Sequence, residues 1–171
     1  MTGRVVTLLT TLGAAAVPLS TIAARPSPRY LWNASHSVPI GLYELQPNGR
    51  LAVTRLVAVQ PPEPLATFLA DRSYLPRGVP LLKRVLALPG QTVCRDQLAI
   101  TIDKIEMGSA RVHDRSGRPL PVWQGCRVIA DGEVFLMNWQ SADSFDGRYF
   151  GALPMSAIIG TAEPLWTGEE E

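Results

Sequence analysis

The sequence has few of the residues that build metal centres or nucleic-acid surfaces. Its 171 residues include only two histidines, His36 and His113, which share no ligand spacing, and only two cysteines. Two cysteines without neighbouring histidines make a poor zinc site, so we expect no metal. The net charge is +1, and lysine and arginine form no cluster. This distribution lacks the basic patch by which proteins bind nucleic acid, so we expect no nucleic-acid partner.

Aromatic residues are also scarce, at 7% of the chain, and there is no internal repeat or low-complexity tract. Prolines, in contrast, number 15 and are spread along the chain. Because proline interrupts helical hydrogen bonding, this spread favours a loop-rich β domain over a helical bundle. The length suits one compact domain with an appendage.

The appendage is an uncharged segment at residues 5–24, which is long enough to cross a bilayer as a helix. A signal peptide cleaved near Ala24 is one interpretation, and an uncleaved anchor is the other. We favour the anchor, because a signal core usually spans about 7–15 residues. A buried core helix fits less well, since the segment has no polar face. Arg4 precedes it, and Arg25 and Arg29 follow it, so these charges leave its orientation open.

The remaining sequence is typical of short strands separated by turns. We predict strands at residues 51–59, 92–95, 98–102, 110–112, 127–129, 133–138 and 157–162, a short helix at 64–71, and turns at Asp103–Lys104, Ser116–Gly117 and Asp131–Gly132. The apolar run at 81–88 fits either a strand or a helix. The expected architecture is mainly β, as a curled sheet or an open barrel. Cys94 and Cys126 form a disulfide if the domain is exported, and two buried thiols if it is cytosolic.

Two serines lie just before a rigid bend in the stretch NASHSVPIGLYEL, at residues 33–45. Pro39 fixes its backbone and Gly41 permits unusual dihedrals, so Ser37 is presented at a fixed place. A serine nucleophile needs a neighbouring base. Its backbone N–H, together with a second donor such as Ser35, can stabilise an oxyanion. The alternative is an ordinary serine-rich turn.

Lys83 is the best candidate for the base. His36 is adjacent to Ser37, and adjacent side chains of an extended chain point apart. His113 lies in the polar stretch VHDRSGR, which is typical of an exposed loop. Lys83 has apolar residues on both sides, and on a strand it faces away from Arg84, so one of the two is directed inward. A desolvated lysine can be a neutral amine, which makes a Ser–Lys dyad possible. The alternative is an exposed lysine at a sheet edge.

The segment SFDGRYFG supplies a third polar group. An extended chain would place Ser144, Asp146 and Arg148 on one face, and Phe145 and Tyr149 on the other. Ser144 would then offer its hydroxyl to the lysine amine, and the Asp146–Arg148 pair would brace the site. The alternative is a surface ion pair, which stabilises little.

These three segments, in this order, resemble the motifs of the type I signal peptidases, the Ser–Lys proteases of peptidase family S26. SHSVP is similar to the nucleophile motif, LLKRVLALPG to the lysine motif and SFDGRYFG to the last motif. Within the family, SVPIGLY and SFDGRYFG look most like the smaller conjugative-transfer branch, the TraF-type peptidases. Three departures weaken a general export role more than they weaken the dyad: a Ser37–Pro39 spacing one residue shorter, Gly147 in place of a serine, and no Gly-Asp-Asn run.

The resemblance implies a signal-peptidase-like fold, a curled β-sheet or barrel with an N-terminal transmembrane helix. Residues 1–28 would be the anchor, and residues 29–171 a periplasmic peptidase domain. The protein would cross the cytoplasmic membrane once, with its catalytic domain facing the periplasm or exterior.

By the same resemblance, Ser37 is the nucleophile, Lys83 the general base and Ser35 a donor to the oxyanion together with the Ser37 N–H. Ser144 orients the lysine, Asp146 and Arg148 support the site, and no metal or organic cofactor is implied.

The implied substrate is an exported precursor, such as the pilin subunit or another component of a conjugative transfer system. The implied partners are the membrane and other transfer proteins. Three alternatives stay open: a general signal peptidase that serves secreted proteins, a non-catalytic anchored β module of a transfer apparatus, and a self-cleaving Ser–Lys regulator, which the expected anchor disfavours.

Overall fold

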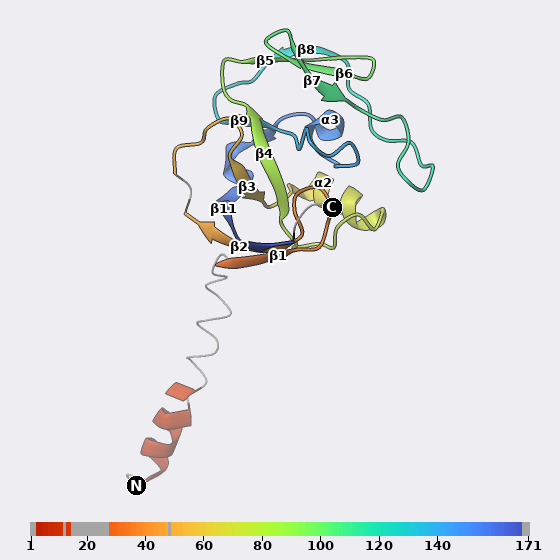
Figure 1. The fold of residues 1–171 in the computed structure, drawn as a ribbon. Coiled ribbons are helices and arrows are strands. Elements are labelled where there is room, and N and C mark those ends of the chain that lie inside the picture. The colour runs from red at the N-terminus through yellow and green to blue at the C-terminus, as the bar shows by residue number, and fades with distance from the viewer. Residues whose placement is uncertain (1–2, 12, 15–27, 48, 169–171) are drawn as a thin grey trace.

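The structure, a computed structural model, describes residues 3–11, 13–14, 28–47 and 49–168 (Figure 1). Residues 3–11 and 13–14 are helical and exposed. The predicted anchor at residues 5–24 falls largely outside the described residues. Within the part of the chain that is described, no helix reaches the length and hydropathy that a membrane crossing requires. The anchor therefore stays a prediction.

Strands dominate the described residues, so the mainly β prediction is confirmed. The strands are β1 (Tyr30–Asn33), β2 (Gly41–Gln46), β3 (Leu56–Val59), β4 (Leu81–Ala87), β5 (Thr92–Asp96), β6 (Ala99–Ile102), β7 (Ile105–Ser109), β8 (Gly125–Val128), β9 (Glu133–Leu136), β10 (Leu153–Pro154) and β11 (Ile158–Thr167). The helices are α2 (Glu63–Asp71), α3 (Gly147–Phe150) and the 3₁₀ turn η1 (Met155–Ala157).

The strands form two antiparallel sheets. The larger has the order β1-β2-β11-β3-β4-β9-β10, and the smaller has the order β7-β6-β5-β8. Figure 1 shows the larger sheet curving from β1 and β2 at one end to β9 at the other, where the smaller sheet lies. The strand β4 is central because β3 and β9 pair with its two edges, whereas β1 is an edge strand.

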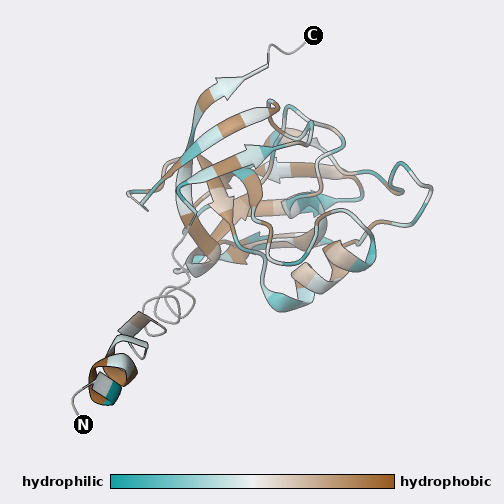
Figure 2. Ribbon diagram, turned by 90° about the horizontal axis from the view of Figure 1, so that it is seen from below, coloured by the Kyte–Doolittle hydropathy of each residue, from teal (hydrophilic) through white to brown (hydrophobic). Residues whose placement is uncertain are grey.

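Hydrophobic residues line both faces of the central strands. In β3, Val57 and Val59 pack into one hydrophobic cluster, while Leu56 and Ala58 pack into another. A continuous apolar run is what a strand buried on both faces requires, because successive side chains point to opposite sides. Figure 2 shows brown, hydrophobic segments on the strands of the domain and on the N-terminal helix.

A third hydrophobic cluster joins the two sheets. Leu86 of β4 and Phe135 of β9 pack with Val93 of β5 and with Ile100 of β6. The smaller sheet is therefore part of the same core, and its residues reach towards α3.

Most predicted elements are confirmed with small shifts in their bounds. The run at 81–88 is the strand β4, so its interpretation as a helix was wrong; β4 forms ladders with strands on both sides, which a helix cannot do. The helix predicted at 64–71 is α2, with Pro64 in its first turn, where its missing N–H is tolerated. The strands β1, β2, β7 and β10 were not predicted.

Three segments differ from the prediction. Residues 51–55 are not strand, because the chain turns at Thr54, whose φ is 74°. Residues 110–112 are not strand either; the turn at Asp103–Lys104 leads directly into β7, which ends at Ser109. The segment SFDGRYFG is not extended, because Asp146 caps the short helix α3 by accepting a hydrogen bond from the Arg148 N–H.

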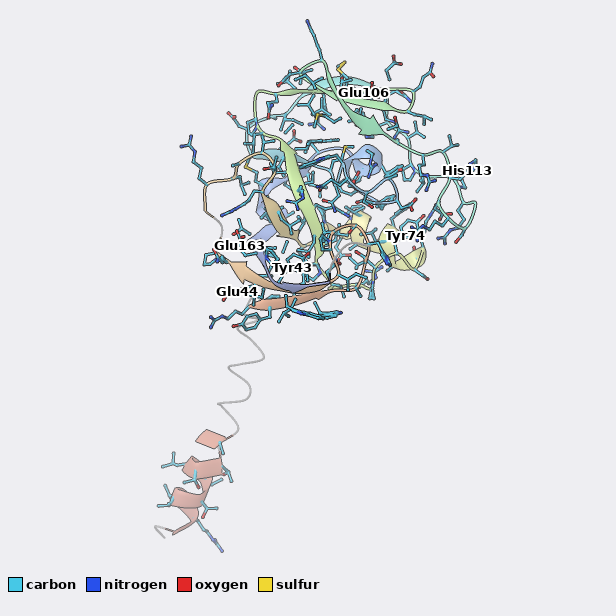
Figure 3. The ribbon with its side chains drawn as sticks, in the orientation of Figure 1. Tyr43, Glu44, Tyr74, Glu106, His113 and Glu163 are labelled. Atoms are coloured by element: carbon cyan, nitrogen blue, oxygen red, sulfur yellow. A yellow bond between two sulfur atoms is a disulfide. The ribbon has the colours of Figure 1, made fainter. Side chains whose placement is uncertain are left out.

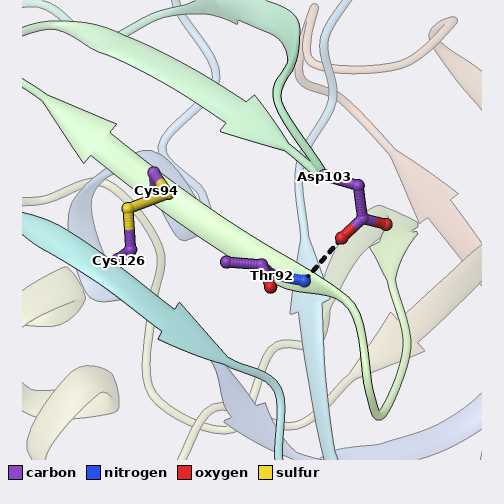
Figure 4. The surroundings of a disulfide bond; sticks show 4 residues. All are labelled: Thr92, Cys94, Asp103 and Cys126. Carbon is purple, nitrogen blue, oxygen red and sulfur yellow. Dashed lines mark hydrogen bonds between the residues drawn. A yellow bond between two sulfur atoms is a disulfide. The ribbon is translucent and has the colours of Figure 1, made fainter.

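The smaller sheet carries a disulfide between Cys94 of β5 and Cys126 of β8 (Figure 4). The two residues are directly paired across the strands, with Cα atoms 4.0 Å apart. On the other edge of β5, the Thr92 N–H donates to the carboxylate of Asp103 at 2.8 Å. The cross-link closes a loop with a sequence separation of 32 residues.

We predict that replacing Cys94 and Cys126 together by serine lowers the unfolding free energy by about 2–4 kcal/mol, because the cross-link restricts the unfolded chain. Chemical denaturation with and without a thiol reductant measures this difference. The reductant should destabilise the wild type and leave the double variant unchanged. An equal stability of reduced and oxidised wild type would contradict the prediction.

Candidate active site

Ser35 and Ser37 lie in the loop that joins β1 to β2. The pairing of Asn33 with Gly41 closes this loop at its base. Gly41 is required there, because a Cβ would lie 2.1 Å from the carbonyl oxygen of Trp166 on β11. Ser37 is half-buried, Ser35 is exposed, and their hydroxyl oxygens are 2.9 Å apart. The sequence prediction that a rigid bend presents the two serines together agrees with this geometry.

Lys83 lies in the middle of β4 and points inward, with 3% of its surface exposed, whereas Arg84 is half-buried. Its Nζ donates a hydrogen bond to Ser144 Oγ at 2.8 Å. Burial lowers the pKa of Lys83 to about 8; the charge of Asp146 opposes this shift, and that of Arg148 adds to it. A large fraction of this amine is therefore neutral at mildly alkaline pH.

A buried ion pair supports Ser144. Asp146 and Arg148 are both fully buried, and their side chains are joined by two hydrogen bonds of 2.8 Å. Arg148 Nη2 also donates to the carbonyl oxygens of Ser141 at 2.7 Å and Ser144 at 3.1 Å. Arg95 of the smaller sheet donates to the carbonyl oxygen of Arg148 at 2.6 Å. The pair therefore fixes the backbone that carries Ser144.

Asn138 is a supporting residue that the sequence did not reveal. Its Nδ2 donates to the Leu82 carbonyl at 3.1 Å, and its Oδ1 accepts from the Arg84 N–H at 2.9 Å. The Asn138 amide thus holds the backbone on both sides of Lys83, as a neighbouring strand would. Its own N–H donates to Asp146 at 3.1 Å. Only one feature of the sequence hinted at this role, namely that Asn138 lies just after the strand β9.

Ser37 and Lys83 line one cleft of about 910 Å³, together with Ser35 and Ser144. The structure thus brings all four predicted polar groups to one place. Lys83 donates to Ser144, however, and Ser37 contacts Ser35; among the described residues no hydrogen bond joins Ser37 to Lys83. In the part of the chain that is described, no group of three or more His, Cys, Asp or Glu residues is arranged to hold a metal ion.

The cleft is also lined by Leu69 of α2, by the loop that follows α2 and by the arm, residues 110–121. Figure 3 shows Tyr74 and His113 on this side of the molecule. Asp143, the residue before Ser144, binds Arg111 and Arg115 of the arm. Tyr74 Oη donates to Asp114 at 2.5 Å. These bonds connect the arm to the segment that carries Ser144 and to the loop after α2.

The core beneath Gly147 leaves no room for a side chain at this position. A Cβ at this position would lie 2.6 Å from the Leu136 carbonyl oxygen and 2.7 Å from the Phe135 ring. The predicted departure from the family pattern, glycine in place of serine, therefore has a steric cause in this chain.

Comparisons with known proteins show which family the chain belongs to. Residues 2–166 match the model of the family described as "Signal peptidase, peptidase S26". The chain belongs to this family, and the resemblance seen in the sequence is confirmed.

Two relatives are TraF proteins of conjugal or plasmid transfer. The chain is 34% identical over 149 residues to the conjugal transfer protein TraF of Agrobacterium fabrum, covering 81% of this chain and 82% of the relative. It is 34% identical over 151 residues to a plasmid transfer protein TraF of Escherichia coli, covering 79% and 81%. Among solved structures, a signal peptidase I of Enterococcus faecalis V583 matches with a TM-score of 0.40 at 16% identity, covering 66% of this chain and 97% of that chain.

We predict that Lys83→Met stabilises the protein at neutral pH. Below pH 8 the buried lysine is charged, and methionine removes that charge while it keeps a similar length. The gain should be about 1–3 kcal/mol, because the loss of the hydrogen bond to Ser144 offsets part of it.

The gain should shrink as pH rises. The folded-state pKa of Lys83 is lowered from 10.5 to about 8, so between these values the unfolded chain binds more protons and the wild type becomes more stable with pH. Denaturant unfolding at several pH values measures both effects. Lys104→Met, in an exposed turn, is the matched control. A destabilised Lys83→Met protein at neutral pH would contradict the prediction.

Proposed function

We propose that this protein is a serine endopeptidase in which Ser37 is the nucleophile and Lys83 is the general base. The observation that carries the proposal is the buried amine of Lys83. Its pKa is lowered to about 8, Ser144 holds it, and it lines the same cleft as Ser37. A lysine with this pKa is partly neutral near pH 8 and can accept a proton there. An exposed lysine stays protonated at that pH and cannot act as a base.

The reaction follows from the groups in the cleft. Substrate binding turns Ser37 from Ser35 towards Lys83. The neutral amine takes the hydroxyl proton while Ser37 Oγ attacks the scissile carbonyl. The Ser37 N–H and the Ser35 hydroxyl stabilise the oxyanion. Lys83 then gives its proton to the leaving amine, and an acyl-enzyme forms at Ser37. Lys83 next activates a water molecule or another amine, which releases the acyl group.

The proposed substrate is an exported precursor of a conjugative transfer system, such as its pilin subunit. The relatives named for conjugal and plasmid transfer support this choice. In this proposal residues 1–28 anchor the protein in the cytoplasmic membrane, and residues 29–171 act on its outer face. A general role in signal-peptide removal is the second candidate, which the family match favours.

We predict that Ser37→Ala and Lys83→Ala each abolish precursor cleavage without unfolding the protein, because each removes one member of the dyad. The measurement is cleavage of a pilin precursor from a conjugative transfer system, with a general secretory precursor as the second substrate. Ser156→Ala and Lys104→Ala, both at exposed positions, are the matched controls.

Normal cleavage by the Lys83→Ala protein would rule out the mechanism. A penem-type acylating probe separates the enzyme from a non-catalytic binding module: covalent labelling that is lost in Ser37→Ala supports the enzyme. Cleavage of the secretory precursor at an equal rate would favour the general role.

We also predict that kcat/KM for cleavage falls about tenfold for each pH unit below 8 and reaches a plateau above it. Only the neutral form of Lys83 can accept the serine proton, and acidification protonates it. Initial rates on a fluorogenic peptide across this range give the profile. A rate that stays level from about pH 6 to about pH 9 would contradict a lysine base.

A further inference from the structure

The side chain of Asn33 organises the nucleophile loop. Asn33 is the last residue of β1 and is 9% exposed. Its Nδ2 donates to the carbonyl oxygens of Ser35 at 2.8 Å, Val38 at 3.0 Å and Pro39 at 3.0 Å. These carbonyls lie on both sides of Ser37 in the chain. One amide therefore holds the bend that presents the nucleophile.

The contacts of Asn33 also fix which way its amide faces. Carbonyl oxygens only accept hydrogen bonds, so the NH₂ group must face them. The Oδ1 atom consequently faces Ser35 and accepts from its N–H at 3.2 Å and from its hydroxyl at 2.9 Å.

This orientation determines the direction of both serine protons. The Ser35 hydroxyl has one proton, which it donates to Asn33. The contact of 2.9 Å between the two hydroxyl oxygens must then be a hydrogen bond from Ser37 to Ser35. In the free protein the proton of the nucleophile therefore points to Ser35 and not to Lys83.

We infer that Asn33 is a positioning residue that controls Ser37 through Ser35; this role rests on the proposed function. Before substrate binds, Asn33 holds the Ser35 proton, and Ser35 in turn holds the Ser37 proton. A developing oxyanion attracts the Ser35 proton more strongly than the neutral Asn33 oxygen does. When Ser35 turns to the oxyanion, Ser37 loses its acceptor and donates to Lys83.

The same amide preserves the loop during this exchange. The three carbonyl contacts of Nδ2 do not involve the Ser35 hydroxyl, so they persist when that hydroxyl turns. The Ser37 N–H thus keeps its place as the second oxyanion donor. Asn33 itself does not touch the reacting atoms.

The first test is Asn33→Ala, assayed with the fluorogenic peptide. We expect kcat to fall about 10- to 100-fold with little change in KM, because the nucleophile is misplaced while the rest of the cleft is intact. Ser156→Ala is the control. All variants are compared at a temperature well below the melting transition of each.

The second test is Asn33→Asp, which separates the two halves of the amide. The carboxylate keeps the acceptor towards Ser35 but sets a second oxygen against the three carbonyls. Protonation restores one donor, and burial among carbonyls raises the pKa of such a carboxyl. The ratio of its kcat to that of the wild type should therefore rise several-fold from about pH 9 to about pH 6. The ratio cancels the titration of Lys83, and that of Asn33→Ala should stay level.

The third test combines Asn33→Ala with Ser35→Ala. Because part of the effect of Asn33 passes through the Ser35 hydroxyl, the loss in kcat of the double variant should be smaller than the product of the two single losses. A purely structural role of Asn33 predicts that the losses multiply.

The outcomes distinguish this role from the proposed function. An active wild type with a fully active Asn33→Ala protein overturns only the role of Asn33. Losses that multiply, or a level pH ratio for Asn33→Asp, also overturn it. A wild type that cleaves no precursor and takes up no acylating probe overturns the proposed function, and the role of Asn33 with it.

Discussion

The hydrogen bond between the buried amine of Lys83 and the hydroxyl of Ser144 is the interaction on which the rest of the site depends. An ammonium group in the protein interior loses its hydration, which favours the neutral form. A neutral amine can still rotate away, so it also needs a fixed partner. Ser144 supplies that partner, and its own position depends on the ion pair of Asp146 and Arg148.

The supporting network explains why so many polar groups are buried beside one lysine. Arg148 is charged in the core, and the hydrogen bonds and charge of Asp146 outweigh the effect of burial and raise its pKa. The remaining donors of Arg148 are directed to backbone carbonyls, including those of Ser141 and Ser144. Asn138 holds the strand on either side of Lys83 in the same way. Burial therefore lowers the pKa of Lys83, while the charges of Asp146 and Arg148 act on it in opposite directions.

The sequence allowed the residues that line the candidate site to be predicted better than the residues that support them. Lys83 was recognisable because alternation along an apolar strand directs one of two adjacent cations inward. Ser35 and Ser37 were recognisable from the bend that follows them. The helix α3 was missed because four residues are too few to show a helical period, and its start depends on the cap formed by Asp146.

The two asparagines were missed for a different reason. Asn33 and Asn138 act on backbone carbonyls and N–H groups, which every residue has. A sequence pattern cannot show which backbone groups a side chain will reach. The strand β1 was also missed, because its pairing with β2 depends on the conformation of the loop between them.

Lys83 and the loop that carries Ser37 have different supports in the sheet. Lys83 lies in a strand with neighbours on both edges, whereas the serine loop joins the outermost strand, β1, to β2. Outer strands open and shift at lower free energy than inner ones. The hairpin that carries Ser37 therefore shifts at lower free energy than the strand that carries Lys83. In the proposed mechanism, a ligand bound to that hairpin would change the position of Ser37 without disturbing Lys83.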